Sequence, residues 1–316
     1  MHLIQTSALT KAFDGRTVVD HVNLGVSRGE VVGFLGPNGA GKSTTMKMIA
    51  GFLEPDEGSA SVCGHDVRTD PLNAKRHLGY LPEGAPAYSD MIVGDFLEFV
   101  AKLRNVPSGE RTARLAEMAE RINLTEVWGQ KIENLSKGYK RRVGIAQALL
   151  HDPDVLILDE PTDGLDPNQK HEMRSLIRSI AEKKAIIVST HILEEVEAVC
   201  SRAVIIADGK ILADEAPEDL TAAAVQDNAI RVTVIAAEGE DIVAKLGPVA
   251  GKAEIELLTR VNGSASLLVK PQGRATQPAQ LASKLQRAKI EIEEIGFHRP
   301  SLEDVFRQIT QSRSSD

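Results

Sequence analysis

The chain has 316 residues, of which 42% are hydrophobic and 26% are charged, and this length accommodates one large α/β domain with a smaller second domain. Its formal net charge of −8 argues against a general nucleic-acid binder, because such binding depends on clustered Lys and Arg. The two cysteines, Cys63 and Cys200, lack metal or disulfide spacing, and no stretch approaches the roughly 18 apolar residues that span a bilayer. We therefore expect a reducing compartment, no nucleic-acid partner, and any membrane connection only through a partner.

Short β-branched runs alternate with helical stretches over residues 1–216. This alternation predicts a doubly wound α/β domain with a mainly parallel sheet. Between about 84 and 147 the pattern changes to helix-period segments, which predicts a helical subdomain inserted into the α/β core. The expected strands are VVGFLG at 31–36, VLILDE at 155–160, AIIVST at 185–190 and RAVIIAD at 202–208.

A glycine-rich loop follows the first of these apolar runs. It reads GPNGAGKST, fits GxxxxGK[ST], and precedes a helical run. Its glycines let the backbone wrap a phosphate group closely, Lys42 reaches the β- and γ-phosphates, and the Ser43 hydroxyl is placed to coordinate Mg²⁺. The nucleotide-binding residues expected here are Gly36, Pro37, Asn38, Gly39, Ala40, Gly41, Lys42, Ser43 and Thr44.

Polar side chains end two later apolar runs. VLILDEP ends in Asp159 and Glu160, and AIIVSTH ends in His191. Alone, the two acids would be read as solvated residues at a strand end, and the histidine as structural. Beside a phosphate loop, we expect Asp159 to hold Mg²⁺ through water and Glu160 to orient or deprotonate an attacking water. His191 is expected to reach the γ-phosphate, so the catalytic set is Glu160, His191 and Lys42.

These segments, with LSKGYKRR at 135–142 and GLDP at 164–167, together resemble the ABC ATPase family over residues 3 to about 216. The resemblance implies ATP and Mg²⁺ as ligands and a head-to-tail homodimer. In such a dimer each ATP lies between one phosphate loop and the partner's signature segment. It also implies that Ser136 and Gly138 contact the partner's nucleotide, that Asp166 couples the two sites, and that adenine stacks on Phe13.

Two positions depart from the commonest family pattern. The signature is usually LSGGQ, whereas Lys137 and Tyr139 replace its second glycine and its glutamine. Glu83 stands where the family usually has a glutamine that touches Mg²⁺, and a carboxylate can still be a metal ligand. Both variants resemble the drug-export and gliding-motility branch, which often carries a C-terminal extension ending in a PSLEDVF-like segment, here 300–306.

The last part of the chain has a different pattern of predicted strands and helices. After an expected linker at 217–228, strand and helix patterns follow in the order βαββαβ, which predicts a small α+β domain over 229–316 of ferredoxin-like type. A last helix is expected after Pro300, where Ser301 can cap and Asp304 sits at the reciprocal position. We favour a dimerisation or packing role for this domain over ligand-binding regulation.

The resemblance implies the ATP-hydrolysing subunit of an exporter, peripheral on the cytoplasmic face of the inner membrane and coupled to an integral permease of the ABC-2 type. One alternative is a soluble, non-transport ABC ATPase acting on ribosomes or DNA. Such proteins tend to carry two ATPase domains, a coiled-coil insertion or basic surfaces, none of which the sequence shows. The other alternative is a nucleotide-dependent scaffold without turnover, against which the intact Lys42, Asp159, Glu160 and His191 weigh.

Overall fold

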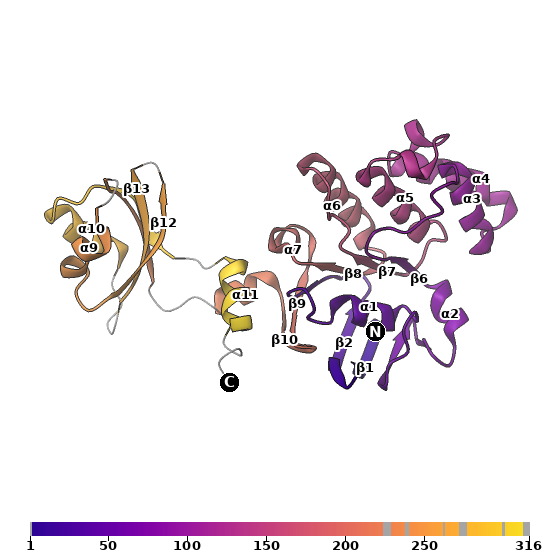
Figure 1. Ribbon diagram of the computed structural model, residues 1–316, viewed down its shortest axis with the longest axis horizontal. Coiled ribbons are helices and arrows are strands. Elements are labelled where there is room, and N and C mark those ends of the chain that lie inside the picture. Colours follow the sequence, from indigo (N-terminus) through magenta and orange to yellow (C-terminus); the bar gives the residue numbers. More distant parts are fainter. Residues whose placement is uncertain are drawn as a thin grey trace. The chain divides into compact units, whose positions relative to one another are not determined.

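The structure is a computed structural model that describes residues 2–223, 229–237, 240–261, 263–271, 277–298 and 301–311. The chain divides into two compact units, Met1–Pro217 and Glu218–Asp316, and many of their elements are labelled in Figure 1. Helix α8 (Pro217–Ala223) occupies the first part of the expected linker. Residues 224–228 of that linker, and Pro300 before the last helix, lie outside the described residues.

A six-stranded sheet forms the centre of the first unit. Its strand order is β10-β9-β3-β8-β7-β6, and all neighbours are parallel except β10 and β9. Every residue of the four strands from β3 to β6 is buried, as expected for parallel strands that are covered on both faces. The mainly parallel sheet predicted from the sequence is therefore confirmed. Its strands are β3 (Val31–Leu35), β6 (Leu78–Leu81), β7 (Val155–Asp159), β8 (Ala185–Thr190), β9 (Arg202–Ala207) and β10 (Lys210–Glu215).

The same unit contains a second sheet that the sequence pattern did not reveal. It is antiparallel, with the order β2-β1-β4-β5. Its two long strands bury only seven of their 24 residues, so they form no continuous apolar run of the kind that marks the central strands. Helix α1 (Lys42–Ile49) contacts strands of both sheets. The strands are β1 (His2–Phe13), β2 (Arg16–Ser27), β4 (Glu57–Val62) and β5 (His65–Asp66).

The middle of the first unit is helical. The described residues between Gly84 and Leu149 contain no strand, and three amphipathic helices there pack around a shared apolar core that includes Phe96, Leu115 and Ile145. Helix α5 also packs on β6, which joins this helical region to the central sheet. The helices of the first unit that follow α1 are α2 (Pro71–Arg76), α3 (Val93–Leu103), α4 (Ser108–Arg121), the 3₁₀ turns Thr125–Val127 and Ile132–Asn134, α5 (Lys137–Leu149), α6 (Pro167–Ala181) and α7 (Leu193–Val199).

The second unit has the βαββαβ order expected from the sequence. Its antiparallel sheet has the order β12-β13-β11-β14, and the side chains of α9 and α10 complete an apolar core with the sheet. The elements are β11 (Ile230–Ile235), α9 (Ile242–Ala250), β12 (Glu254–Val261), β13 (Ser264–Lys270), α10 (Pro278–Arg287), β14 (Ile292–Phe297) and α11 (Leu302–Gln311). Helix α11 begins after Ser301, whose hydroxyl accepts a hydrogen bond from the Asp304 backbone N–H, as predicted. None of the helices in the described ranges combines the length and apolar character needed to cross a bilayer.

Candidate functional site

The phosphate loop leaves the carboxyl end of β3 and enters α1. Gly41 precedes the helix with φ of +103°, and a Cβ atom there would lie 2.5 Å from the Val18 carbonyl oxygen. A Cβ atom on Gly36 would lie 2.3 Å from the Ile206 carbonyl oxygen. Side chains at these two positions would collide with backbone, so glycine is required for the loop to curl this tightly. A glycine loop that leads into a helix N-terminus is an arrangement that binds phosphate through backbone N–H groups.

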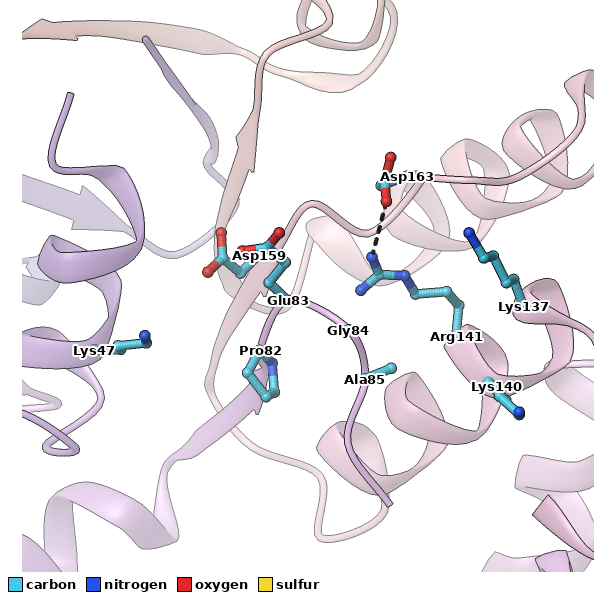
Figure 2. A pocket seen from close by; sticks show the side chains of 10 residues that line it. All are labelled: Lys47, Pro82, Glu83, Gly84, Ala85, Lys137, Lys140, Arg141, Asp159 and Asp163. Atoms are coloured by element: carbon cyan, nitrogen blue, oxygen red, sulfur yellow. Dashed lines mark ion pairs between the residues drawn. The ribbon is translucent and has the colours of Figure 1, made fainter. Parts of the chain in front are cut away.

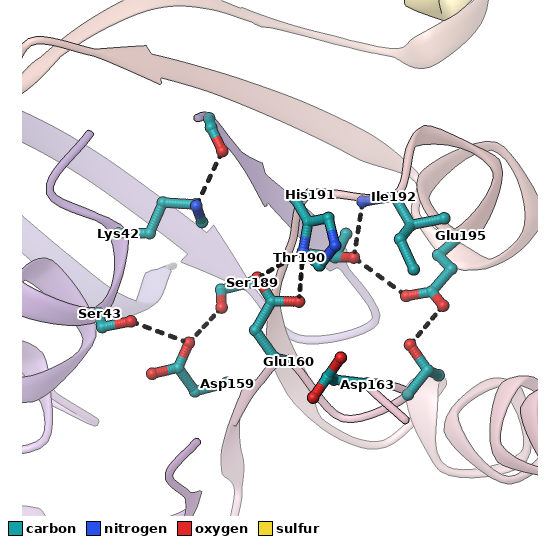
Figure 3. Close-up of polar contacts among 12 residues, drawn as sticks. Lys42, Ser43, Asp159, Glu160, Asp163, Ser189, Thr190, His191, Ile192 and Glu195 are labelled. Atoms are coloured by element: carbon teal, nitrogen blue, oxygen red, sulfur yellow. Dashed lines mark hydrogen bonds and ion pairs between the residues drawn. The ribbon is translucent and has the colours of Figure 1, made fainter. Parts of the chain in front are cut away.

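Lys42 is the first residue of α1 and is buried. Its Nζ atom donates hydrogen bonds to the carbonyl oxygens of Gly36, at 2.8 Å, and Pro37, at 3.1 Å, so the side chain folds back over the loop (Figure 3). Burial lowers the pKa of the Lys42 ammonium, while the carboxylates of Glu160 and Asp159 oppose that shift. A buried cation held against two carbonyls at this place suits a phosphate group.

Asp159 is the last residue of β7 and is 1% exposed. Its Oδ1 atom accepts hydrogen bonds from the Ser43 hydroxyl, at 3.3 Å, and from the Ser189 hydroxyl (Figure 3). Its Oδ2 atom is buried and has no hydrogen-bond partner in the part of the chain that the structure describes. A buried carboxylate oxygen without a partner is costly unless a ligand satisfies it. Since Mg²⁺ prefers oxygen ligands, the donor set fits this ion.

Glu160 follows Asp159 and has a left-handed backbone with φ of +50°, an uncommon conformation for this residue type. Its two carboxylate oxygens lie 3.1 and 3.0 Å from Nδ1 of His191. Burial raises the pKa of the Glu160 carboxyl, and the hydrogen bond from His191 opposes that rise. The side chain of Glu160 is mostly buried whereas that of His191 is half exposed. The geometry gives a poised carboxylate whose orientation is set by a histidine.

A buried carboxylate behind the histidine was missed by the sequence interpretation. Glu195 on α7 accepts hydrogen bonds from the hydroxyl of Thr162 and, at 3.0 Å, from that of Thr190. Thr190 in turn accepts a hydrogen bond from the Ile192 backbone N–H at 3.0 Å, so the loop that carries His191 is fixed on both sides (Figure 3). The acid therefore joins the turn after β7 to the loop after β8. An acid in an amphipathic helix is usually solvated, and nothing in its local sequence indicated otherwise.

The phosphate loop, Glu160 and His191 line a cavity of about 480 Å³. Glu83, in the loop after β6, also lines it. The structure thus brings together most of the residues predicted for the phosphate and metal site. Phe13, the adenine-stacking candidate, is half exposed at the end of β1 beside Lys11, and its stacking on adenine stays a prediction. The lining residues are Val18, Asn38, Gly39, Gly41, Lys42, Ser43, Thr44, Glu83, Glu160, Asp163 and His191.

Comparison with known proteins gives a consistent result. The family model described as "ABC transporter" matches residues 19–163. The Nod factor export ATP-binding protein I of Burkholderia pseudomallei strain 1710b is 35% identical over 315 residues, covering 97% of this chain and 96% of that protein. The chain belongs to the ABC transporter ATP-binding proteins. It is thus an ATPase that uses Mg²⁺, and the family predicted from its sequence motifs is confirmed.

Two further likenesses each cover about 70% of the chain. The "Probable multidrug ABC transporter ATP-binding protein YbhF" of Escherichia coli K12 is 38% identical over 226 residues, which is 71% of this chain, and the chain spans 39% of the length of that relative. A solved structure entitled "Structure of ATP binding subunit of ABC transporter" matches with a TM-score of 0.66 and 32% identity. It covers 70% of this chain and 92% of the solved chain.

The remaining residues expected from the ABC ATPase pattern lie outside the cavity of their own chain. Ser136 caps α5 by accepting a hydrogen bond from the Tyr139 backbone N–H at 3.3 Å. Asp166 caps α6 in the same way through the N–H of Gln169, at 2.9 Å. A Cβ atom on Gly138 would lie 2.5 Å from the Gln169 side chain, so the starts of α5 and α6 pack closely. The trans contacts predicted for Ser136, Gly138 and Asp166 stay predictions.

Proposed function

We propose that the chain binds ATP with Mg²⁺ in the cavity above α1 and hydrolyses it to drive a separate membrane permease, as an exporter. The observation that carries the proposal is the convergence of a buried lysine, a partly unsatisfied aspartate and a histidine-held glutamate on one phosphate loop. Relatives named for multidrug transport and Nod factor export support the direction.

Each residue has a role in this proposal. The loop N–H groups and Lys42 bind the β- and γ-phosphates, and Ser43, Asp159 and Glu83 hold Mg²⁺, which neutralises phosphate charge when bound. Glu160 orients a water and accepts its proton as the water oxygen bonds to the γ-phosphorus. The bond from the γ-phosphorus to the β,γ-bridging oxygen breaks, so ADP and orthophosphate leave. His191 keeps Glu160 in position.

The active site is completed by a second copy of the chain. Ser136 is exposed at the N-terminus of α5, where a capped helix end favours an anion such as the partner's γ-phosphate. The head-to-tail pairing requires that each site combine one chain's phosphate loop with the other chain's Ser136. We assign to the C-terminal domain predicted over residues 229–316, which lies within the second unit, a packing role in this dimer.

Mixing two inactive variants tests the pairing. Lys42→Ala removes the phosphate loop's cation, and Ser136→Arg blocks the signature helix at an exposed position. A mixed dimer then keeps one intact site, so a 1:1 mixture should recover about a quarter of wild-type turnover, since about half of random dimers are mixed. Each variant alone should be inactive. No recovery, although native mass spectrometry detects mixed dimers, would contradict a site shared between chains.

A small apolar surface on α3 and the loop before it supports a permease of the ABC-2 type as partner. Tyr88 is 58% exposed, and its ring lies 5.9 Å from that of Phe99, which is 41% exposed; Leu103, one turn further along the helix, is 66% exposed. Exposed aromatic and apolar side chains grouped in this way mark protein contacts. Docking here would hold the chain at the cytoplasmic face of the inner membrane.

Copurification tests this assignment. The double variant Tyr88→Ser/Phe99→Ser should keep the ATPase activity of the isolated chain but no longer recover a polytopic membrane protein from detergent extracts. Phe297→Ser, which removes a similarly exposed aromatic from β14, is the matched control and should recover it. If wild type recovers ribosomes or DNA and no membrane protein, the soluble alternative replaces the transport proposal.

A further inference from the structure

A second cavity, of about 560 Å³, adjoins the nucleotide cavity and shares Glu83 and Asp163 with it. Figure 2 shows it between the loop after β6, the end of β7 and the start of α5. The roles derived above for the ATPase use only part of its wall. Four cationic and three acidic side chains line it, together with Pro82, Gly84 and Ala85: Lys47, Lys137, Lys140, Arg141, Glu83, Asp159 and Asp163.

Two side chains that line this cavity each have one buried polar atom without a hydrogen-bond partner among the described residues. Arg141 on α5 is 5% exposed, and its Nη2 atom lies 3.8 Å from Oδ2 of Asp163. Its Nη1 atom is buried and has no hydrogen-bond partner among the described residues, as is also true of Asp159 Oδ2. A buried guanidinium that is only loosely paired is unfavourable unless an anion satisfies it. One cavity therefore holds an acceptor that suits a cation and a donor that suits an anion.

We propose that this cavity is an orthophosphate site, which receives the product of ATP hydrolysis before it leaves. The proposal rests on the ATPase activity, because hydrolysis generates orthophosphate in the neighbouring cavity. An arginine fork matches two phosphate oxygens, and orthophosphate needs donors on the side away from Mg²⁺, where Arg141 lies. Lys47 and Lys140 line the same cavity and add positive potential around the leaving anion.

Asp163 gives the cavity a negative charge that opposes the binding of orthophosphate. Its side chain is 59% exposed, and it lines both cavities, so its carboxylate competes with phosphate for Arg141. Asp163 and Arg141 should therefore act on phosphate affinity in opposite directions. If the pair served only to hold α5 against the turn after β7, loss of either partner would act in the same direction.

The test is the affinity for added orthophosphate, measured as inhibition of steady-state ATP turnover with ADP and Mg²⁺ present. Arg141→Gln should raise the inhibition constant for phosphate by about tenfold, which is the loss of affinity expected for one charge-assisted contact. Arg142→Gln is the matched control, because Arg142 lies on the same helix but pairs with Glu172 outside this cavity. It should leave the constant within about twofold of wild type.

A second variant keeps the proposal falsifiable if Arg141→Gln unfolds. Asp163→Asn changes an exposed side chain and should tighten phosphate inhibition by about threefold, because a competing carboxylate is removed. Release of orthophosphate in single turnovers, followed with a fluorescent phosphate sensor, should slow in the same variant. An inhibition constant unchanged in both variants would overturn the site and place phosphate in the phosphate loop itself. Weaker phosphate inhibition in Asp163→Asn would also overturn it, while ATP turnover in the absence of added phosphate reports separately on hydrolysis.

Discussion

Strand β7 carries an aspartate near each end, and the two have opposite surroundings. Asp154 lies just before the strand; Arg28 donates to one of its oxygens at 2.6 Å, and His77 pairs with the other at 2.8 Å. Asp159 ends the strand with one oxygen shared by two hydroxyls and the other oxygen unpaired among the described residues. Aspartate therefore has a different role at each edge of the sheet: Asp154 is paired within the protein, and Asp159 keeps an oxygen for a ligand.

The difference is electrostatic. Although burial opposes it, hydrogen bonds from Arg28 and His77 lower the pKa of Asp154, so this acid is satisfied by the protein itself. At the carboxyl edge, Asp159 is more deeply buried but is left with acceptor capacity for a ligand. A satisfied acid contributes to stability, and an unsatisfied buried acid indicates a binding site.

The largest effect should come from the residue next to Asp159. Glu160→Gln keeps the shape of the side chain but removes the proton acceptor, so turnover should fall by about 10²–10⁴-fold. ATP binding should persist, and the variant should accumulate as an ATP-bound dimer, seen by size-exclusion chromatography. Turnover like that of wild type would show that the base has been assigned to the wrong residue.

The two ends of β7 can be compared directly by one change. Asp159→Asn should raise the Mg²⁺ concentration needed for half-maximal turnover by about 10–100-fold, as expected for a group that holds a metal through water. Asp154→Asn should leave that dependence unchanged and lower the free energy of unfolding by about 1 kcal/mol, because partly exposed charged hydrogen bonds are weakened. Mg²⁺ titrations and urea denaturation measure the two effects. Similar results at both positions would remove the distinction drawn between the two edges.

The sequence predicted the parts of this site that are contiguous. GPNGAGKST and the acids after VLILD lie in short motifs, so their chemistry could be inferred before the fold was known. Glu195 could not be inferred, because Thr162 reaches it only when β7 and β8 pair and α7 folds back. Likewise, Arg141 lies in a charged helical segment, where a cation is usually solvated. The antiparallel sheet of β1 was missed because its two long strands form no continuous apolar run.

Acidity offers a finer probe of the carboxyl edge. Burial raises the pKa of Glu160, and the catalytic form is the carboxylate, so kcat should fall on acidification at a pH above the ordinary glutamate value of 4.5. His191 opposes this rise, so His191→Gln should move the acid limb of its residual activity to higher pH. Comparing the variant with wild type cancels the titration of ATP itself. If the acid limb stays in place or moves to lower pH, His191 does not lower the pKa of Glu160.

The smallest effect is expected at Glu83, which lines both cavities but does not end β7. Glu83→Gln restores the residue usual in the family and keeps an oxygen for Mg²⁺, so nucleotide affinity should stay within about threefold of wild type. The variant also removes one carboxylate from the shared wall. Stimulation by the permease should therefore change while the basal ATPase rate stays similar, as measured with the chain alone and with the reconstituted complex.

A large loss of Mg-ATP binding in Glu83→Gln would instead place Glu83 with Asp159, as an acid whose charge the metal requires. The comparison along β7 would then extend to β6, because both strands would end in an essential carboxylate. If only permease stimulation changes, the metal depends on the acid inside β7. In that case Glu83, in a loop beside the helical region, transmits the effect of the permease to the ATPase site and is not needed to bind Mg²⁺.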